Sequence, residues 1–515
     1  MLAENILNIE GGQGRIIGFS LTQLLTHISF KLGGLNGVYI FGSLLIFLNS
    51  CLLYYFVKHF MSLPIASLTT LLFILYPADT TKLLLIHIFQ LQLSLTFVLI
   101  AFNLYAARRN MPAFIFAFCS LLTYENAFLP FLAAPLFIYE WDKKQIKRFA
   151  LHIVVCLSLI FILLLLRKIL GESRASEIEG IETVKKIFMS LLVGPIISLY
   201  SFINMFGDVF SSMSLIKWIF ITGIILFSVW MIFSARFDFS SKVIKAHIFD
   251  ASIFKITLEG YYSFYHSLKL IIASLFMLMC SYLFSFTHFP PLALYGRTTS
   301  VHLASSIAGS IFIALIINII YLVIYKNKHL KPWFLNVLIV IFLSLLLSRG
   351  FLIQKDFTES WKEQKQFWRE IVNTTADSKE NTIILVQADT FREDIKFVGT
   401  YTWPIPEIYN QIFHFNPAWT SPPRVAIYEN SFYGPLKSNE NGIYFEPEYP
   451  FLFEFRDKVF LQDSNFIYIH YIMNKAVRID TAILCDSIII HSLVHDFNEK
   501  YNFEKQPVGV LLLNN

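Results

Sequence analysis

The chain has 515 residues and a formal net charge of +5; 56% of the residues are hydrophobic, only 15% are charged, and the mean hydropathy is +0.58. A soluble protein of this length carries much more polar surface, so the composition excludes the soluble classes and predicts an integral membrane protein. The small positive charge does not indicate nucleic-acid binding, because the basic residues gather in short turns between apolar runs.

The first 34 residues are predicted to form an outer loop followed by an amphipathic helix. The opening sequence MLAENILNIEGGQGR has neither a basic start nor an apolar core, so it is not a signal peptide. The amphipathic part runs from Ile16 to Leu32.

Ten apolar runs follow, and each is a candidate membrane-spanning helix by its length and composition. The predicted fold class is therefore a membrane all-α protein, a polytopic bundle of about ten transmembrane helices over residues 35–354. The runs are 35–57, 62–77, 83–106, 111–123, 126–139, 147–168, 215–234, 268–287, 300–325 and 332–354.

Turns rich in Lys and Arg separate several of these runs and should face the cytoplasm. Two turns can lie on the same side of the membrane only if an even number of spans separates them. This condition holds for all the basic turns only if the run 187–207, which Gly194-Pro195 interrupts, is a re-entrant or interfacial helix and does not span. The basic turns are Lys58-His59, Arg108-Arg109, Lys143 to Arg148, Arg236 to Lys255 and Lys326 to Lys331. The segments then placed outside the cytoplasm are 1–34, 78–83, 123–126, 169–214, 288–299 and everything after 355.

Residues 355–515 differ in character, because charge, proline and glycine rise and no further span follows. Large apolar residues recur at helical spacing over 357–371, which predicts an amphipathic helix just outside the membrane. Alternating or β-branched runs after this helix predict strands, and the whole segment is predicted to be a C-terminal extracytoplasmic α/β domain. The predicted strands are 382–386, 424–428, 451–455, 466–471 and 508–513.

Short motifs in the first third of the chain follow a distinctive order. An aromatic-Pro-x-acid motif ends one apolar run, an Arg-Arg turn ends the next, and a Glu-Asn pair precedes a run that contains proline. This order resembles the GT-C superfamily of polytopic glycosyltransferases and is most similar to its protein O-mannosyltransferase-like members. The residues that carry the resemblance are Tyr76, Pro77, Asp79, Leu121, Leu122, Tyr124, Glu125, Asn126 and Pro130.

The resemblance implies an inverting, metal-independent transferase that takes a sugar from a polyprenyl-phosphate carrier. The acceptor would be an extracytoplasmic glycan, lipid or protein, and the partners would be the lipid-linked sugar donor and membrane lipids. No cofactor is expected, and the default location is a bacterial inner membrane. The five cysteines show no metal-ligand spacing and no disulfide framework.

In the resembled superfamily, a first span precedes a long outer loop that carries the catalytic Asp and ends in Gly-Arg. Gly14-Arg15 matches that ending, and Arg15 is therefore expected beside the substrate. The chain is accordingly expected to start inside the loop, without the first span and without the usual Asp.

Sugar transfer needs a general base for the acceptor hydroxyl, and the candidates are Glu4, Glu10 and Asp79. A carboxylate near an apolar rim has a raised proton affinity, which suits a base. Glu10 lies just before Gly14-Arg15, whereas the alternative role for Glu4 and Glu10 is that of solvated loop residues. Asp79 follows Pro77 at the entry to a helix, where capping the helix is an alternative or additional role.

The departing phosphate needs cations, and Arg297, Lys82 and His87 are the candidates. Arg297 lies in the outer loop HFPPLALYGRTTSVH, where a guanidinium and free backbone N–H groups can act together on a phosphate. Its alternative role is to reach lipid headgroups. His288 and His302 flank the same loop and are weaker candidates.

Two further predictions concern polar residues inside the bundle. His87, Gln90 and Ser94 share one helical face, where they line the carrier groove or tie helices together. Glu125, at an outer helix junction, is predicted to cap a helix or to pair with Lys82 or Arg15.

Other functions stay open on the sequence alone. One is a non-catalytic membrane protein, either a transporter or an inactive relative that binds glycolipid, and another is a polysaccharide polymerase or ligase. A transporter is expected to show internal repeats with interrupted spans in matching halves, and no clear repeat is visible.

Overall fold

The chain divides into two compact units, Met1–Gln354 and Lys355–Asn515. The computed structural model describes residues 15–84, 88–169, 180–212, 214, 217–219, 221–223, 226, 260–285, 290–294, 296–326, 332–380, 382–388, 412–414, 423–428, 436–439, 442–445, 459–460, 466–472, 475–484, 488–491 and 504–505.

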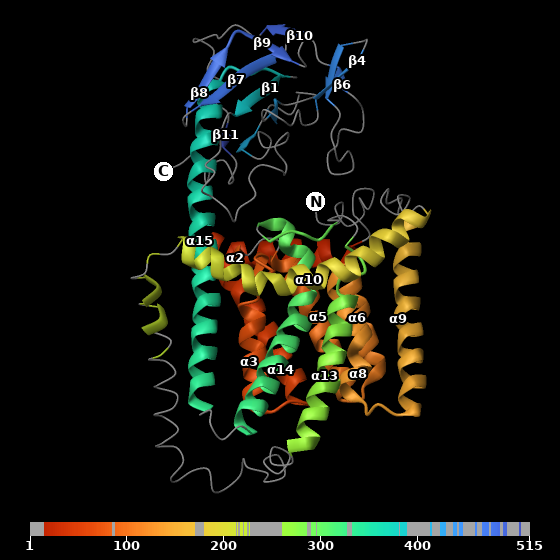
Figure 1. Cartoon of the computed structure of the whole chain (residues 1–515). Helices are drawn as coiled ribbons and strands as arrows, with labels where there is room; N and C mark the ends of the chain where they lie inside the picture. The colour runs from red at the N-terminus through yellow and green to blue at the C-terminus, as the bar shows by residue number, and fades with distance from the viewer. Residues whose placement is uncertain are drawn as a thin grey trace. The chain divides into compact units, whose positions relative to one another are not determined.

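The first unit is a helical bundle (Figure 1). Its helices are α2 (Ile16–Lys58), α3 (Leu63–Ile74), α4 (Thr81–Leu84), α5 (Ile88–Ala106), α6 (Asn110–Thr123), α7 (Glu125–Phe128), η2 (Leu129–Ala133), α8 (Ala134–Ile138), α9 (Lys143–Ile169), α10 (Gly180–Ser212), α13 (Gly260–Cys280), η4 (Arg297–His302), α14 (Ser305–Lys326) and the first part of α15 (Pro332–Thr374).

Six helices of the described chain are long and apolar enough to cross a membrane, namely α2, α5, α9, α10, α14 and α15. Four others are apolar but shorter; α6, for example, has 14 residues. A helix of that length rises only about 21 Å, less than the ~30 Å of a bilayer core. The helical membrane class is confirmed, but ten spans are not, and the predicted span 215–234 lies largely outside the described residues.

The predicted change from amphipathic segment to span falls at a kink inside α2. Gly33 and Gly34 are the two residues of this helix with non-helical backbone angles, and Gly34 has a φ of 58°. This left-handed conformation strains residues that carry a Cβ, so the glycine pair marks where the helix changes direction.

The predicted break near Glu125 is also present. Tyr124 is extended between α6 and α7, with φ −157° and ψ 108°. Pro130 and Pro135 lie in the following helical segments, and a 3₁₀ turn separates α7 from α8 there. Because proline lacks an N–H and crowds the preceding turn, this stretch folds as short helical pieces.

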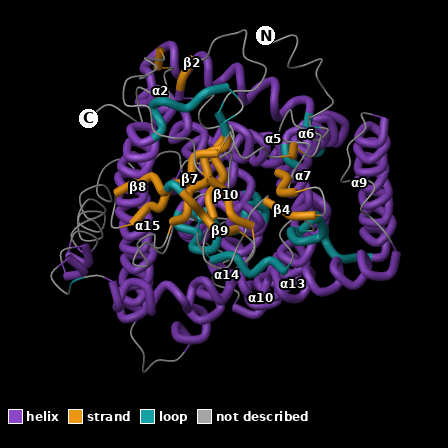
Figure 2. The backbone as a smooth tube through the Cα atoms, turned by 90° about the horizontal axis from the view of Figure 1, so that it is seen from above, coloured by secondary structure: helices purple, strands orange, loops and turns teal. Residues whose placement is uncertain are grey.

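Helix α10 lies across the upright helices α13 and α14 near one end of the bundle (Figure 1). Seen from above, it follows one edge of the bundle from α9 toward α15 (Figure 2). The helix is continuous over 33 residues with Pro195 inside it. Its orientation is that of an interfacial helix, although its length and composition also suit a span.

The core of the bundle combines aromatic rings with small residues. Phe56 packs on Phe102 with ring centroids 4.6 Å apart, and Phe102 packs on Phe131 at 5.5 Å. Alanines such as Ala113 and Ala117 are fully buried in the same core. Lipid tails are as apolar as these side chains, so close packing, rather than exclusion from water, holds the helices together.

The second unit contains a four-stranded mixed sheet in the order β3-β1-β7-β8. Strand β1 pairs in parallel with β3 and β7, and β8 is antiparallel to β7. Phe367, Trp368 and Ile371, from the last turns of α15, pack against this sheet. The strands of the unit are β1 (Ile383–Ala388), β2 (Phe413–His414), β3 (Arg424–Tyr428), β4 (Leu436–Asn439), β5 (Gly442–Phe445), β6 (Val459–Phe460), β7 (Phe466–Ile472), β8 (Lys475–Ile479), β9 (Thr481–Leu484), β10 (Ile488–His491) and β11 (Glu504–Lys505).

Three predicted strands correspond to β1, β3 and β7. The other two, 451–455 and 508–513, lie outside the described residues.

Candidate functional site

The candidate site begins in the loop between α3 and α5, where Asp79 is buried. Its Oδ1 accepts hydrogen bonds from the backbone N–H of Thr81 at 3.1 Å and from the Thr81 hydroxyl at 2.5 Å. Its Oδ2 lies 3.9 Å from Nζ of Lys82. Asp79 therefore holds the start of α4, as the capping alternative predicts, and it forms a buried ion pair.

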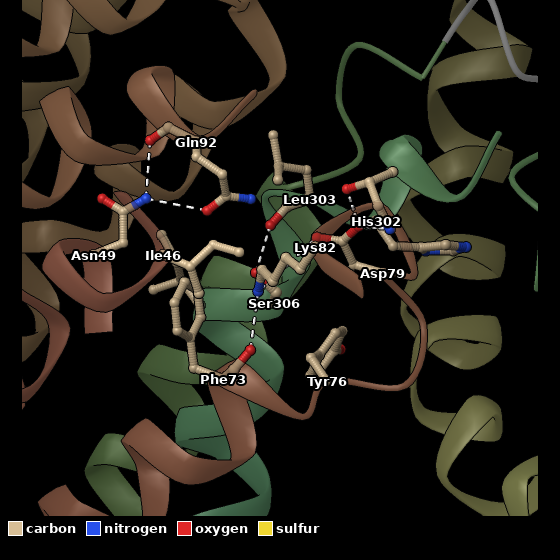
Figure 3. Close-up of polar contacts among 12 residues, drawn as sticks. Ile46, Asn49, Phe73, Tyr76, Asp79, Lys82, Gln92, His302, Leu303 and Ser306 are labelled. Carbon is tan, nitrogen blue, oxygen red and sulfur yellow. Dashed lines mark hydrogen bonds and ion pairs between the residues drawn. The ribbon is translucent and has the colours of Figure 1, made fainter. Parts of the chain in front are cut away.

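Lys82 turns back toward the end of α3 (Figure 3). Its Nζ donates to the carbonyl of Phe73 at 2.9 Å and lies 3.6 Å from the centroid of the Phe73 ring. This carbonyl is one of the last in α3, which lack partners within the helix, so the ammonium caps α3. Lys82 is a predicted phosphate-binding residue, and in the structure its ammonium contacts Phe73 and Asp79.

Burial sets the charge preference of this pair. Burial raises the pKa of Asp79, and the neighbouring Lys82 ammonium opposes that shift. Burial lowers the pKa of Lys82 to about 8, against the attraction of Asp79. A carboxyl group with a raised pKa has the proton affinity of a general base, but Asp79 is only 1% exposed.

A second loop joins the first at η4. The backbone N–H of Thr80 donates to the Thr299 hydroxyl at 3.1 Å, and the Thr80 hydroxyl donates to the carbonyl of Gly296 at 3.0 Å. Arg297, the first residue of η4, lies between these two partners in the chain. The structure therefore brings the Asp79 loop and the Arg297 loop to the same end of the bundle.

Arg349 holds the same loops together, and the sequence analysis did not single it out. It lies in α15 within the first unit and is 1% exposed. Its guanidinium donates to the carbonyls of Pro77 and Leu294, and its Nε lies 3.3 Å from Oδ2 of Asp208 in α10. The signal that could have revealed it is an arginine inside the apolar run 332–354, since intramembrane charges usually face the interior of a bundle.

Two tyrosines form a hydrogen-bonded chain beneath α10. The hydroxyl of Tyr76 contacts that of Ser198, which lies 3.1 Å from the hydroxyl of Ser305. The Tyr282 hydroxyl lies 3.0 Å from Ser305 and 2.6 Å from Nδ1 of His302. These hydrogen bonds thus link α10 to the loops around Asp79 and Arg297.

His302 completes this network in its neutral form. Its Nε2 lies 2.8 Å from the carbonyl of Ala293 and donates to it, while Nδ1 faces the Tyr282 hydroxyl. Burial lowers the pKa of His302 to about 4, and the bond to Ala293 opposes the shift only in part. A neutral imidazole is a poor phosphate ligand, so the geometry gives His302 a structural role.

Arg15 and Glu125 form a second polar cluster. The Arg15 guanidinium donates to both Glu125 carboxylate oxygens, at 2.9 and 2.7 Å, and stacks 4.5 Å from the centroid of the Tyr124 ring. Nη2 of Arg167, in the last turn of α9, lies 3.1 Å from Oε2 of Glu125. Burial alone would raise the pKa of Glu125, but the two guanidinium groups outweigh it and hold the pKa well below its usual range.

This cluster resolves the pairing of Glu125, because Arg15 is its partner and Lys82 pairs with Asp79. Gly18 makes the contact possible. A Cβ at this position would lie 2.5 Å from the carbonyl oxygen of Thr123, so α2 approaches the end of α6 directly. Arg15 and Glu125, predicted to bind substrate, therefore connect α2, α7 and α9.

On the predicted polar face of α5, Ser94 ties helices together, whereas the side-chain nitrogen of Gln90 makes no hydrogen bond among the described residues. The Ser94 hydroxyl lies 3.1 Å from that of Ser120 and donates to the carbonyl of Tyr124 at 3.0 Å. Asn49 of α2 donates to the backbone and side chain of Gln92, two residues before Ser94 and outside that predicted face, at 2.9 and 3.1 Å (Figure 3). These bonds follow the helix-tie alternative.

Several predicted residues lie outside the described part of the chain. They are Glu4, Glu10, His87, His288 and the side chain of Arg297. Among the residues that are described, no group of three or more His, Cys, Asp or Glu side chains could hold a metal ion.

The chain was compared with protein-family models, curated proteins and solved structures. None of them matches it.

Proposed function

We propose that the protein is a membrane-bound glycosyltransferase that moves a sugar from a polyprenyl-phosphate carrier to an extracytoplasmic acceptor. The observation that supports it best is the pair of bonds from Thr80 to Gly296 and Thr299. These bonds join the loop of a buried carboxylate to the loop of Arg297. A base and a phosphate-binding cation at one end of a membrane bundle are what this transfer requires.

In the proposed reaction, the acceptor oxygen attacks the anomeric carbon of the donor sugar. The bond from that carbon to the phosphate oxygen breaks, and the carrier phosphate leaves with the electron pair. Arg297 pairs with the leaving phosphate, because a guanidinium matches phosphate geometry and stays charged. A carboxylate takes the acceptor proton.

Two carboxylates are candidates for this base. Asp79 has the raised proton affinity, but Thr81 and Lys82 cover it, so an acceptor would have to displace the Lys82 ammonium to reach it. Glu10 lies near Gly14-Arg15 in the chain and is the second candidate. Variants of each residue separate the two.

The test uses purified protein in liposomes with radiolabelled undecaprenyl-phosphate glucose or undecaprenyl-phosphate mannose, and membrane extract as the acceptor. Release of undecaprenyl phosphate is measured for the wild type and for Arg297→Ala and Arg297→Lys. We expect loss of release in the alanine variant and partial release in the lysine variant. Full release by Arg297→Ala removes this residue from the site.

The base is identified in the same assay. Asp79→Asn or Glu10→Gln should abolish release, depending on which carboxylate acts. Lys168→Gln is the matched control, because it removes an exposed charge at the end of α9 and leaves the proposed machinery intact. Absence of release from both donors by the folded wild type contradicts the use of these carriers.

A further inference from the structure

A cationic surface lies at the end of the bundle where the basic turns meet. Arg108 follows α5, Arg148 lies in the first turns of α9, and Lys269 lies in α13. All three converge on Tyr139, the residue after α8. The Cζ atoms of Arg108 and Arg148 lie 4.2 and 5.0 Å from the Tyr139 ring centroid, and Nζ of Lys269 donates to the Tyr139 carbonyl at 2.8 Å.

The backbone of Arg108 has an unusual conformation for its residue type. Its φ is 63°, and it is the one non-glycine residue of the described chain with a positive φ. Its N–H bonds to the Tyr105 carbonyl and the N–H of Arg109 bonds to the Leu104 carbonyl, which is the Schellman pattern at the end of a helix. Glycine is the usual residue here, so an arginine costs roughly 1 kcal/mol.

Within the part of the chain that the structure describes, few carboxylates accompany the cations of this surface. Among the residues that the structure describes, neither Arg108 nor Arg148 forms an ion pair. The nearby acids are Glu140, which acts on Lys269, and Asp142, whose Oδ1 accepts from the N–H of Gln145 at 2.6 Å and caps α9. The exposed Arg109, Lys143, Lys144 and Lys147 add to the positive charge. Among the described residues at this end, seven cations therefore accompany two carboxylates, a local excess of positive charge that attracts an anion.

Exposed apolar residues near these cations in the chain indicate that the ligand is an amphiphile rather than a soluble anion. Met111, two residues after Arg109, and Ile146, between Lys143 and Arg148, are 78% and 69% exposed. Trp141, 45% exposed, lies between them in the chain, and indole rings favour the headgroup level of a bilayer. Cations at a membrane surface beside exposed apolar helices match a lipid headgroup with its acyl chains.

We propose that Arg108, Arg148 and Lys269, arranged around Tyr139, bind the phosphate headgroup of an anionic phospholipid. The site is remote from the proposed transferase site. The Asp79 loop precedes α5 and Arg108 follows it, and the 19 residues of that helix rise about 28 Å. Binding of the headgroup compensates the strained backbone of Arg108 and stabilises the junction of α5, α8, α9 and α13.

The test titrates dioleoyl-phosphatidylglycerol into the full-length protein in dioleoyl-phosphatidylcholine nanodiscs and follows bound lipid by native mass spectrometry. Arg108→Gly should weaken phosphatidylglycerol binding about fivefold, the effect of one cation near a membrane surface. In phosphatidylcholine alone the same variant should be as thermostable as the wild type or more so, because glycine suits the backbone. Arg148→Gln should weaken binding to a similar extent.

Lys168→Gln is the matched control and should bind phosphatidylglycerol as the wild type does. Equal binding by the wild type and Arg108→Gly overturns the proposal. So does an equal gain in thermal stability from inorganic phosphate in phosphatidylcholine nanodiscs, which would identify a free anion as the ligand. Loss of thermostability by Arg108→Gly in phosphatidylcholine alone would show that the guanidinium stabilises the protein without lipid, and this also contradicts the proposal.

Discussion

Nε of Arg349 lies 3.3 Å from Oδ2 of Asp208, so a helix predicted to span the membrane is ion-paired to the helix predicted to lie along it. The same guanidinium donates to the carbonyls of Pro77 and Leu294. One buried arginine therefore fixes α10 and both loops of the candidate site.

Removing this guanidinium should destabilise the protein strongly. Arg349→Met removes the guanidinium that lies 3.3 Å from the buried Asp208 carboxylate and should cost about 3 kcal/mol of unfolding free energy. The double variant Arg349→Met with Asp208→Asn should recover part of that loss, because the buried negative charge is removed together with the guanidinium. Thermal unfolding in detergent is measured for the wild type, the two single variants and the double variant. Strictly additive effects of the two substitutions would argue against an interaction between Arg349 and Asp208.

The contact between the two site loops can be tested by cross-linking. The hydroxyls of Thr80 and Thr299 are 2.8 Å apart, so cysteines at both positions should form a disulfide under mild oxidation in a chain whose native cysteines are replaced. Because both positions are buried, a maleimide reagent is added after denaturation, and protection from it reports the bond. A cysteine at the exposed Thr298 paired with Thr80→Cys is the control and should react slowly. Equal cross-linking of both pairs would contradict the observed register of the loops.

The face of α10 that packs on the bundle is tested with two glycines of the same helix. A Cβ at Gly194 would lie 2.3 Å from the ring of Tyr282, whereas a Cβ at Gly207 meets nothing within 4 Å. Gly194→Ala should therefore destabilise the protein by about 2 kcal/mol through overpacking. Gly207→Ala should be neutral or stabilising by roughly 0.5 kcal/mol, because alanine favours a helix. The same melting temperature for both variants would contradict the packing of the Gly194 face of α10 on the bundle.

Acid should destabilise the protein through His302. Its pKa is lowered to about 4 in the folded state, against about 6.5 in an unfolded chain. Between these pH values the unfolded state binds a proton that the folded state does not bind. The free energy of unfolding therefore falls as the pH drops from about 6.5 to about 4, by roughly 3 kcal/mol in total. His302→Gln should lack this part of the pH dependence in thermal melts. Identical pH profiles for both proteins would remove His302 as the cause.

The sequence by itself determined the parts of the molecule that depend on local patterns. Long apolar runs specify membrane helices, and β-branched runs predicted strands β1, β3 and β7, because helix and strand periodicities differ. The break at Tyr124 follows from the polar residues inside an apolar run. The pairing of Glu125 with Arg15 was one of two alternatives that the charges left open.

Only the tertiary structure decided which distant side chains meet. Arg349 and Asp208 are 141 positions apart, and no local pattern connects them. The role of Lys82 also depended on packing: its charge suggested phosphate, but the end of α3 lies close enough to engage the ammonium. Helix lengths were misjudged where proline and short polar turns divide an apolar run, since hydropathy measures composition and does not measure how far a helix extends.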